Sequence, residues 1–240
     1  MRPQNTLPSF ELALKNKLPM IELDTQLAKT GEVVVFHDDK VDEITRGQAH
    51  GAINSFSFDE LQAINVHDGF NDGTYQIPAL EEVLDLVDKY ADESSRTKVN
   101  IELKGSGTAE PVVAIIKKYQ KKGWQLSDFV VSSFKHHELE KFKQLMPEVD
   151  VAVLLNQEQW KALGSAQAAI DLGKKLRAEA INPDVSFTTS DFVKAAHENG
   201  FEVNVYVVNE PEDILRMRNI GADRIFTDNF VTARKVLASQ

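Results

Sequence analysis

Two short runs of the chain place charged side chains at alternate positions. Glu22 and Asp24 lie two residues apart within the segment 20–26, and Glu102 and Lys104 repeat that spacing near position 103. Side chains at i and i+2 of a strand point to the same face, so each pair is expected to project together. One such pair alone is more often a solvated strand end. Two pairs, each closing an expected strand, favour a functional site.

Three converging carboxylates repel one another unless a cation neutralises them. Hard divalent cations such as Mg²⁺ and Ca²⁺ prefer oxygen ligands, and carboxylates suit both. The spacing therefore predicts a divalent metal site made by Glu22, Asp24 and Glu102. Lys104, beside that site, is expected to hold an anionic oxygen of a substrate.

His37 follows the apolar run 33–36 and precedes Asp38. A histidine pKa lies near neutrality, so His37 at a strand end beside a metal would suit proton transfer, with a surface turn residue as the alternative. Ser132-Ser133 lacks a nucleophile-elbow motif, and we interpret it as a strand end. The pair His136-His137 is expected in a solvated first turn of a helix. The remaining histidines have no supporting neighbours in sequence: His50, His67 and His197.

Short β-branched segments alternate with segments of helical apolar spacing. Strands are expected at 20–26, 33–37, 98–103, 129–134, 149–155, 178–183, 201–208 and 224–227, and helices at 7–16, 80–90, 110–123, 190–200 and 211–221. This alternation predicts a parallel sheet, and the count and length favour a (β/α)₈ barrel, in which the C-terminal strand ends meet at one face. No Gly-rich dinucleotide fingerprint or Walker A motif is present. We expect one domain over 1–240, with an insertion at about 39–77.

The composition excludes several classes of protein. The net charge is −10, which argues against a nucleic-acid binder or a binder of anionic membranes. The chain has no cysteine, so disulfides, zinc–thiolate sites and a cysteine nucleophile are excluded. No apolar run is long enough to span a membrane, and the N-terminus lacks a signal-peptide core. We expect a cytoplasmic protein, although a leader that had been removed would leave no trace.

Several segments together resemble the glycerophosphodiester phosphodiesterase family. They occur in family order and span nearly the whole chain. Each is weak alone, but the ordered set is specific. The matching segments are Asn5-Thr6 with Phe10, Ile21 to Asp24, Val35 to Asp38, Ile77 to Leu84, Asn100 to Lys104, Ser132 to Phe134, Val203 to Tyr206 with Asn209-Glu210, and Gly221 to Asp223 with Thr227-Asp228.

The resemblance implies a TIM barrel of the phospholipase-C-like phosphodiesterase type. It implies metal-dependent hydrolysis of a small glycerophosphodiester to glycerol 3-phosphate and an alcohol, a step of lipid and glycerol metabolism. A glycerol hydroxyl would attack phosphorus, and the cyclic phosphate would then hydrolyse. It also assigns roles to residues: metal to Glu22, Asp24 and Glu102, substrate phosphate to Lys104, acid–base work to His37, and the substrate groove to Phe134 and Tyr206, where the family usually has tryptophan at the second position.

The sequence departs from the family pattern near its start. The family carries a first barrel strand with His-Arg-Gly upstream of Pro-Glu-Asn-Thr, whereas this chain begins Met1-Arg2 and reads Pro3-Gln4-Asn5-Thr6. The family's Arg-Thr-Thr after the histidine reads Glu43-Ile44-Thr45. We therefore expect either that the chain begins after the first strand or that it is a degenerate, non-catalytic phosphate- or metal-binding copy. A lipid-cleaving phospholipase of the related superfamily is disfavoured because no basic amphipathic stretch is apparent.

Overall fold

The computed structural model describes residues 2–42, 45, 47, 49–66, 75–92 and 96–239. The chain divides into two compact units, which are treated separately below. The first contains Met1–Val131 and His137–Val149, and the second contains Ser132–His136 and Asp150–Gln240. Strand β4 contributes residues to both. The single domain expected over 1–240 stays a prediction.

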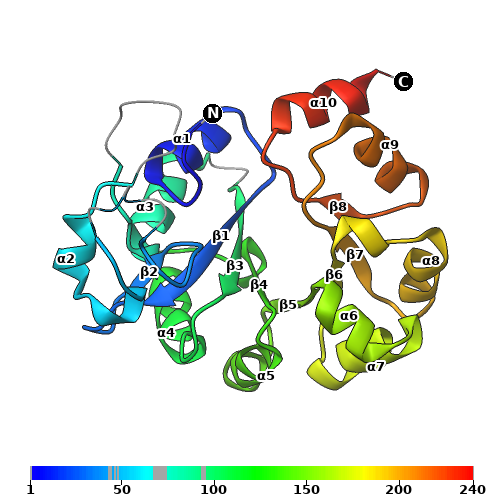
Figure 1. Ribbon diagram of the computed structural model, residues 1–240, viewed down its shortest axis with the longest axis horizontal. Helices are drawn as coiled ribbons and strands as arrows, with labels where there is room; N and C mark the ends of the chain where they lie inside the picture. The colour runs from blue at the N-terminus through cyan, green and yellow to red at the C-terminus, as the bar shows by residue number, and fades with distance from the viewer. Residues whose placement is uncertain are drawn as a thin grey trace. The chain divides into compact units, whose positions relative to one another are not determined.

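Figure 1 traces the secondary structure, which follows the expected alternation closely. The strands are β1 Met20–Leu27, β2 Val33–Val35, β3 Lys98–Leu103, β4 Phe129–Ser133, β5 Asp150–Leu155, β6 Ala180–Pro183, β7 Glu202–Val205 and β8 Arg224–Ile225. The α-helices are α1 Leu7–Lys15, α2 Phe58–Gln62, α3 Leu80–Tyr90, α4 Ala109–Gln120, α5 His136–Leu145, α6 Gln157–Leu163, α7 Ala166–Leu176, α8 Ser190–Glu198, α9 Pro211–Asn219 and α10 Phe230–Ala238. Short 3₁₀ turns are η1 Ile53–Ser55, η2 Leu126–Asp128 and η3 Val185–Phe187.

In the first unit the hydrogen-bonded strand order is β2-β1-β3-β4. Strands β1 and β3 are parallel, with Asp24 opposite Glu102. The expectation of a wholly parallel sheet is wrong at β2, which pairs antiparallel to β1. Only residues 28–32 connect the two strands, and a parallel pair needs a crossover of a dozen or more residues. The short connection therefore forces a hairpin.

The described part of the 39–77 segment forms a small layer of its own against the hairpin. It contains η1 and α2, and isolated bridges join Lys40 to Ala52 and Val66 to Tyr75. Its apolar side chains share one buried cluster with Val34 of β2 and with the flanking residues Ala28 and Phe36. This segment buries one face of the strand that precedes His37. Its interpretation as an insertion stays a prediction. Ser57 begins α2 with a capping box to Glu60.

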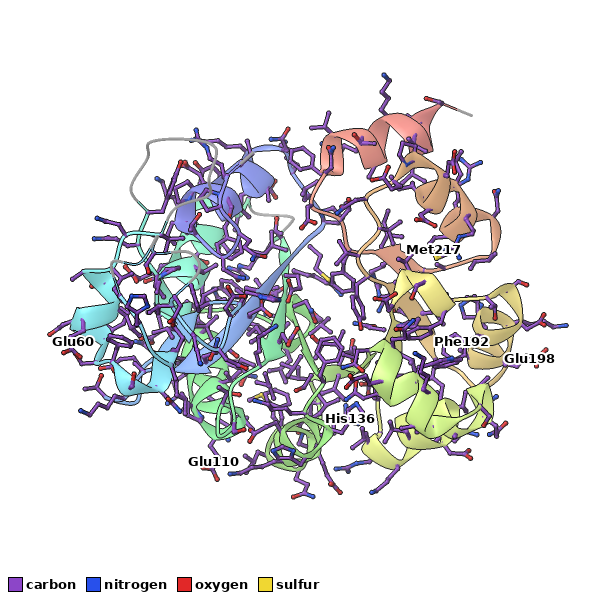
Figure 2. The ribbon with its side chains drawn as sticks, in the orientation of Figure 1. Glu60, Glu110, His136, Phe192, Glu198 and Met217 are labelled. Atoms are coloured by element: carbon purple, nitrogen blue, oxygen red, sulfur yellow. The ribbon has the colours of Figure 1, made fainter. Side chains whose placement is uncertain are left out.

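In the second unit the strand order is β4-β5-β6-β7-β8, and the pairs from β5 to β8 are parallel. Helix α7 packs against β5 and β6, and α8 packs against β7 (Figure 1). Phe192 of α8 and Met217 of α9 are buried, whereas Glu198 at the end of α8 lies at the outer surface (Figure 2). Helix α8 begins at Ser190 as expected, but its cap is Thr189, whose hydroxyl accepts a hydrogen bond from the Phe192 amide at 3.3 Å.

The expected helix stops at Gly123 and Gly221 are confirmed. Both glycines have positive φ, at 97° and 84°, the left-handed conformation that glycine adopts without steric cost. Among the helices in the described ranges, none combines the length and apolar character needed to cross a membrane.

Candidate functional site

The ends of β1 and β3 bring three carboxylates together in the first unit. Glu22 and Asp24 share a face of β1, and the parallel register sets Asp24 beside Glu102 of β3. One carboxylate oxygen from each of the three residues lies within 4.8 Å of the others. Asp24 and Glu102 are buried, and Glu22 is half-buried. The predicted convergence is therefore observed, while the role of the cluster in metal binding stays a prediction.

Lys104 lies beside the carboxylates. Its Nζ is 3.2 Å from Oδ1 of Asp24 and 3.7 Å from Oε1 of Glu102. The three acidic groups with this single ammonium carry a formal charge of −2 when all are ionised. Burial lowers the pKa of Lys104, but the carboxylates of Asp24, Glu102 and Glu22 outweigh it, so the pKa is raised and Lys104 stays protonated.

The pKa of Glu102 shows that its ionised form is disfavoured in this arrangement. Burial, together with the neighbouring Asp24 carboxylate, raises the pKa of Glu102 to about 7, with Lys104 opposing the shift in part. Burial favours the neutral acid, and Lys104 supplies too little positive charge to offset it, so Glu102 ionises only near neutral pH. The excess of negative charge and the all-oxygen donor set fit a hard divalent cation. The cluster is thus chemically suited to the predicted metal.

Asn5 is a contributor that the residue-by-residue reasoning missed. Its Nδ2 donates to Oδ2 of Asp24 at 2.8 Å, and its Oδ1 accepts from the Asp24 backbone amide at 3.1 Å. Asn5 is buried and has φ of 56°, a conformation that asparagine tolerates better than most residues. The following Thr6 caps α1. The segment before α1 therefore fixes one oxygen of Asp24 and leaves the other toward Lys104.

His37 lies just beyond β2, and the hairpin keeps it close to the backbone of β1. The amide of Phe36 donates to the carbonyl of Asp24 at 2.9 Å, one residue before His37. The His37 side chain is 47% exposed, and its Nδ1 lies 2.7 Å from Oδ1 of Asp38. The strand expected over 33–37 ends earlier, at Val35, and is antiparallel to β1, so His37 lies in the bend that follows the strand. Its acid–base role stays a prediction.

The other histidines differ from their sequence interpretation. His136 is half-buried, and its Nε2 contacts the carbonyl of Leu154 at 3.0 Å, so of the pair only the exposed His137 fits the expected solvated turn. His50 and His197 do have carboxylate neighbours, Asp42 at 3.0 Å and Asp223 at 2.8 Å. Asp42 is eight positions from His50 and Asp223 is 26 positions from His197, so neither carboxylate adjoins its histidine in the sequence. His67 and Glu43-Ile44 lie outside the described residues.

Phe134 and Tyr206, the expected groove residues, contact each other in the second unit. Their ring centroids are 5.6 Å apart at an interplanar angle of 84°, an edge-to-face pair. The Tyr206 hydroxyl donates to the carbonyl of Leu155 at 2.8 Å, and Gln159 Nε2 donates to the carbonyl of Phe134 at 2.8 Å. A hydrogen bond from its own hydroxyl therefore fixes the Tyr206 ring, whereas for Phe134 the bond fixes the backbone that carries the ring. Their place in a substrate groove stays a prediction.

Comparison with known proteins gives a consistent result. Residues 1–232 match the model of the glycerophosphoryl diester phosphodiesterase family. A curated glycerophosphodiester phosphodiesterase of Bacillus altitudinis is 33% identical over 94% of this chain and 89% of its own length.

Two solved structures show the same fold. A putative glycerophosphoryl diester phosphodiesterase of Silicibacter pomeroyi has a TM-score of 0.86 at 23% identity, covering 98% of this chain and 88% of its own. An Oleispira antarctica phosphodiesterase, solved in complex with the product sn-glycerol-3-phosphate, has a TM-score of 0.81 at 24% identity, covering 99% and 92%. These likenesses confirm the predicted fold class, an α/β barrel.

Proposed function

Because the chain belongs to the glycerophosphoryl diester phosphodiesterase family, we propose that it hydrolyses a small glycerophosphodiester to glycerol 3-phosphate and an alcohol. The observation that carries this proposal is the carboxylate cluster of Glu22, Asp24 and Glu102, with Lys104 at 3.2 Å from Asp24. The relatives named for this activity and the product bound to the Oleispira antarctica protein support the choice of substrate.

Glu22, Asp24 and Glu102 are the residues that would hold a divalent cation, either Mg²⁺ or Ca²⁺. Such a cation would supply positive charge to the phosphate and its attacking hydroxyl. Asn5 holds Asp24 in place for this task through two hydrogen bonds. Burial and the Asp24 carboxylate raise the pKa of Glu102 to about 7. Protonation of Glu102 would therefore compete with metal binding just below neutral pH.

Two further side chains have separate roles: one binds the phosphate and the other transfers a proton. Lys104, protonated among the carboxylates, binds a phosphate oxygen and offsets the charge that develops during attack. His37 transfers one proton, either from the glycerol hydroxyl as that oxygen bonds to phosphorus, or to the alcohol oxygen as its bond to phosphorus breaks, and solvent water exchanges the other proton. Water then opens the resulting cyclic phosphate to give glycerol 3-phosphate. Phe134 and Tyr206, an edge-to-face pair, are proposed to line the groove that holds the departing alcohol.

The test is release of glycerol 3-phosphate from glycerophosphocholine and glycerophosphoethanolamine, with Mg²⁺, with Ca²⁺ and with a chelator. The wild-type chain is expected to be active with one of the metals and inactive with chelator. Glu22→Gln removes a cluster carboxylate and is expected to abolish turnover, whereas the exposed control Glu198→Gln keeps it. A folded wild-type chain that gained thermal stability from the metal but released no product would favour the alternative, a non-catalytic binder on the same fold.

A further inference from the structure

Gln26 is a buried polar residue that the proposed reaction does not use. It follows Glu22 and Asp24 at the same two-residue spacing, so β1 directs two carboxylates and then an amide to one face. Gln26 is only 6% exposed. A buried amide is retained at little cost only where its hydrogen-bonding groups find partners, so its contacts indicate its purpose.

The amide of Gln26 binds the chain on both sides of His37. Nε2 donates to the carbonyl of Phe36 at 3.0 Å and to the carbonyl of Asp38 at 2.7 Å. Both partners are acceptors, so the amino group alone can face them, and its two hydrogens serve the two bonds. The residue between these carbonyls is His37. Two anchors on either side of one residue fix the direction in which its Cα–Cβ bond leaves the backbone.

Gln26 also lies against the loop that carries Lys104. A Cβ added to Gly105 would lie 3.0 Å from the Gln26 Cα, which is tighter than ordinary van der Waals contact, so a larger residue at 105 would require one of the two backbones to shift. The carbonyl of Thr25 accepts hydrogen bonds from the amides of Lys104 and Gly105, at 3.2 and 2.9 Å. The end of β1 therefore contacts both the turn of His37 and the loop of Lys104.

We infer that Gln26 is a positioning residue that holds His37 in register with the carboxylates of β1. This inference rests on the proposed function, in which His37 transfers a proton. Gln26 acts through the backbone of His37. Its contribution should therefore appear in the rate of the chemical step and should vanish when His37 is absent.

The test compares Gln26→Met, His37→Ala and the double variant in hydrolysis of glycerophosphocholine. Methionine keeps the length and burial of the side chain but loses both hydrogen bonds. We expect Gln26→Met to lower kcat by about 10- to 100-fold, as misplacement of a reacting group by roughly 1 Å would. KM, and the metal concentration that gives half-maximal activity, should stay unchanged. In the His37→Ala background the same change should alter kcat by less than about twofold. Equal losses in the two backgrounds, or wild-type kcat for Gln26→Met, would overturn the inference.

Tyr119→Phe is the matched control. It also removes a buried donor: the Tyr119 hydroxyl of α4 lies 2.8 Å from the carbonyl of Glu81 and 2.7 Å from Oδ1 of Asp85, both in α3. It should leave kcat unchanged.

Amide hydrogen exchange separates this inference from the proposed function. Gln26→Met is expected to speed exchange in the peptide 36–40 by roughly tenfold, whereas Tyr119→Phe should not change it. A wild-type chain without turnover would refute the proposed function, and the exchange rates would still decide whether Gln26 holds the turn. Unchanged exchange in Gln26→Met would refute the positioning role whatever the activity.

Discussion

Glu102→Gln is expected to stabilise the metal-free protein, although it removes a residue of the proposed site. Burial and the Asp24 carboxylate raise the pKa of Glu102 from 4.5 to about 7. At 1.36 kcal/mol per pKa unit, ionising Glu102 in the folded protein costs about 3 kcal/mol more than in the unfolded chain. Glutamine resembles the neutral acid and avoids that cost. Above neutral pH the variant should therefore unfold with a free energy higher by up to about 3 kcal/mol, or a Tm higher by about 6–12 °C.

The dependence on pH follows from the same shift. Between pH 4.5 and about 7 the folded protein keeps a proton on Glu102 that the unfolded chain releases, so the stability of the wild type falls as pH rises through this window. Above that window the loss is complete. Glu102→Gln has no proton to lose there, so its stability should not show this fall.

Urea unfolding in the presence of chelator, at about pH 5 and about pH 8, measures both effects. Glu198→Gln is the control, because Glu198 is exposed on α8 and its change should alter stability by no more than about 0.5 kcal/mol (Figure 2). Saturating Mg²⁺ should reverse the order, raising the stability of the wild type more than that of Glu102→Gln. A metal-free Glu102→Gln less stable than the wild type at about pH 8, with a wild type insensitive to pH, would refute the electrostatic reasoning.

Three further outcomes are expected. His37→Ala should lower kcat by about 10²–10⁴ and keep the Mg²⁺-dependent rise in Tm. Loss of that rise in thermal melts would contradict the assignment of His37 to proton transfer and not to metal binding. Lys104→Met should destabilise the metal-free protein, strengthen metal binding by calorimetry and lower kcat, because it removes the ammonium beside Asp24 and Glu102; weaker metal binding would count against this. Asn5→Ala should lower the free energy of unfolding in urea by about 2–4 kcal/mol, since two hydrogen bonds are lost and alanine must adopt φ of 56°. An unchanged urea midpoint would refute the stabilising role of the two Asn5–Asp24 hydrogen bonds.

Local rules predicted much of the site. The i, i+2 spacing of Glu22 and Asp24 requires only strand geometry, and parallel pairing of β1 with β3 then brings Glu102 alongside. The direction of β2 was predicted wrongly because its apolar composition is that of a buried strand in either direction. The five-residue connection 28–32 held the correct signal, since it is too short for a crossover.

Other contributions depend on contacts that spacing does not reveal. Asn5 reaches Asp24 across 19 positions, and Gln26 reaches Phe36 and Asp38 through the hairpin. Gln26 shares a face of β1 with Glu22 and Asp24, but its acceptors are backbone carbonyls, which carry no signature in the side-chain sequence. The contact of His197 with Asp223 likewise depends on the return of the chain over 26 positions.

The most direct test of the central claim is ³¹P NMR of glycerophosphocholine incubated with the wild-type chain and with Asp24→Asn. The wild type, first treated with chelator and then given Mg²⁺ or Ca²⁺, should convert the diester signal to that of glycerol 3-phosphate only after the metal is restored. Asp24→Asn should leave the diester intact under both metals. A folded wild type that binds metal but leaves the diester signal unchanged, or one that cleaves it equally well in chelator, would contradict the account.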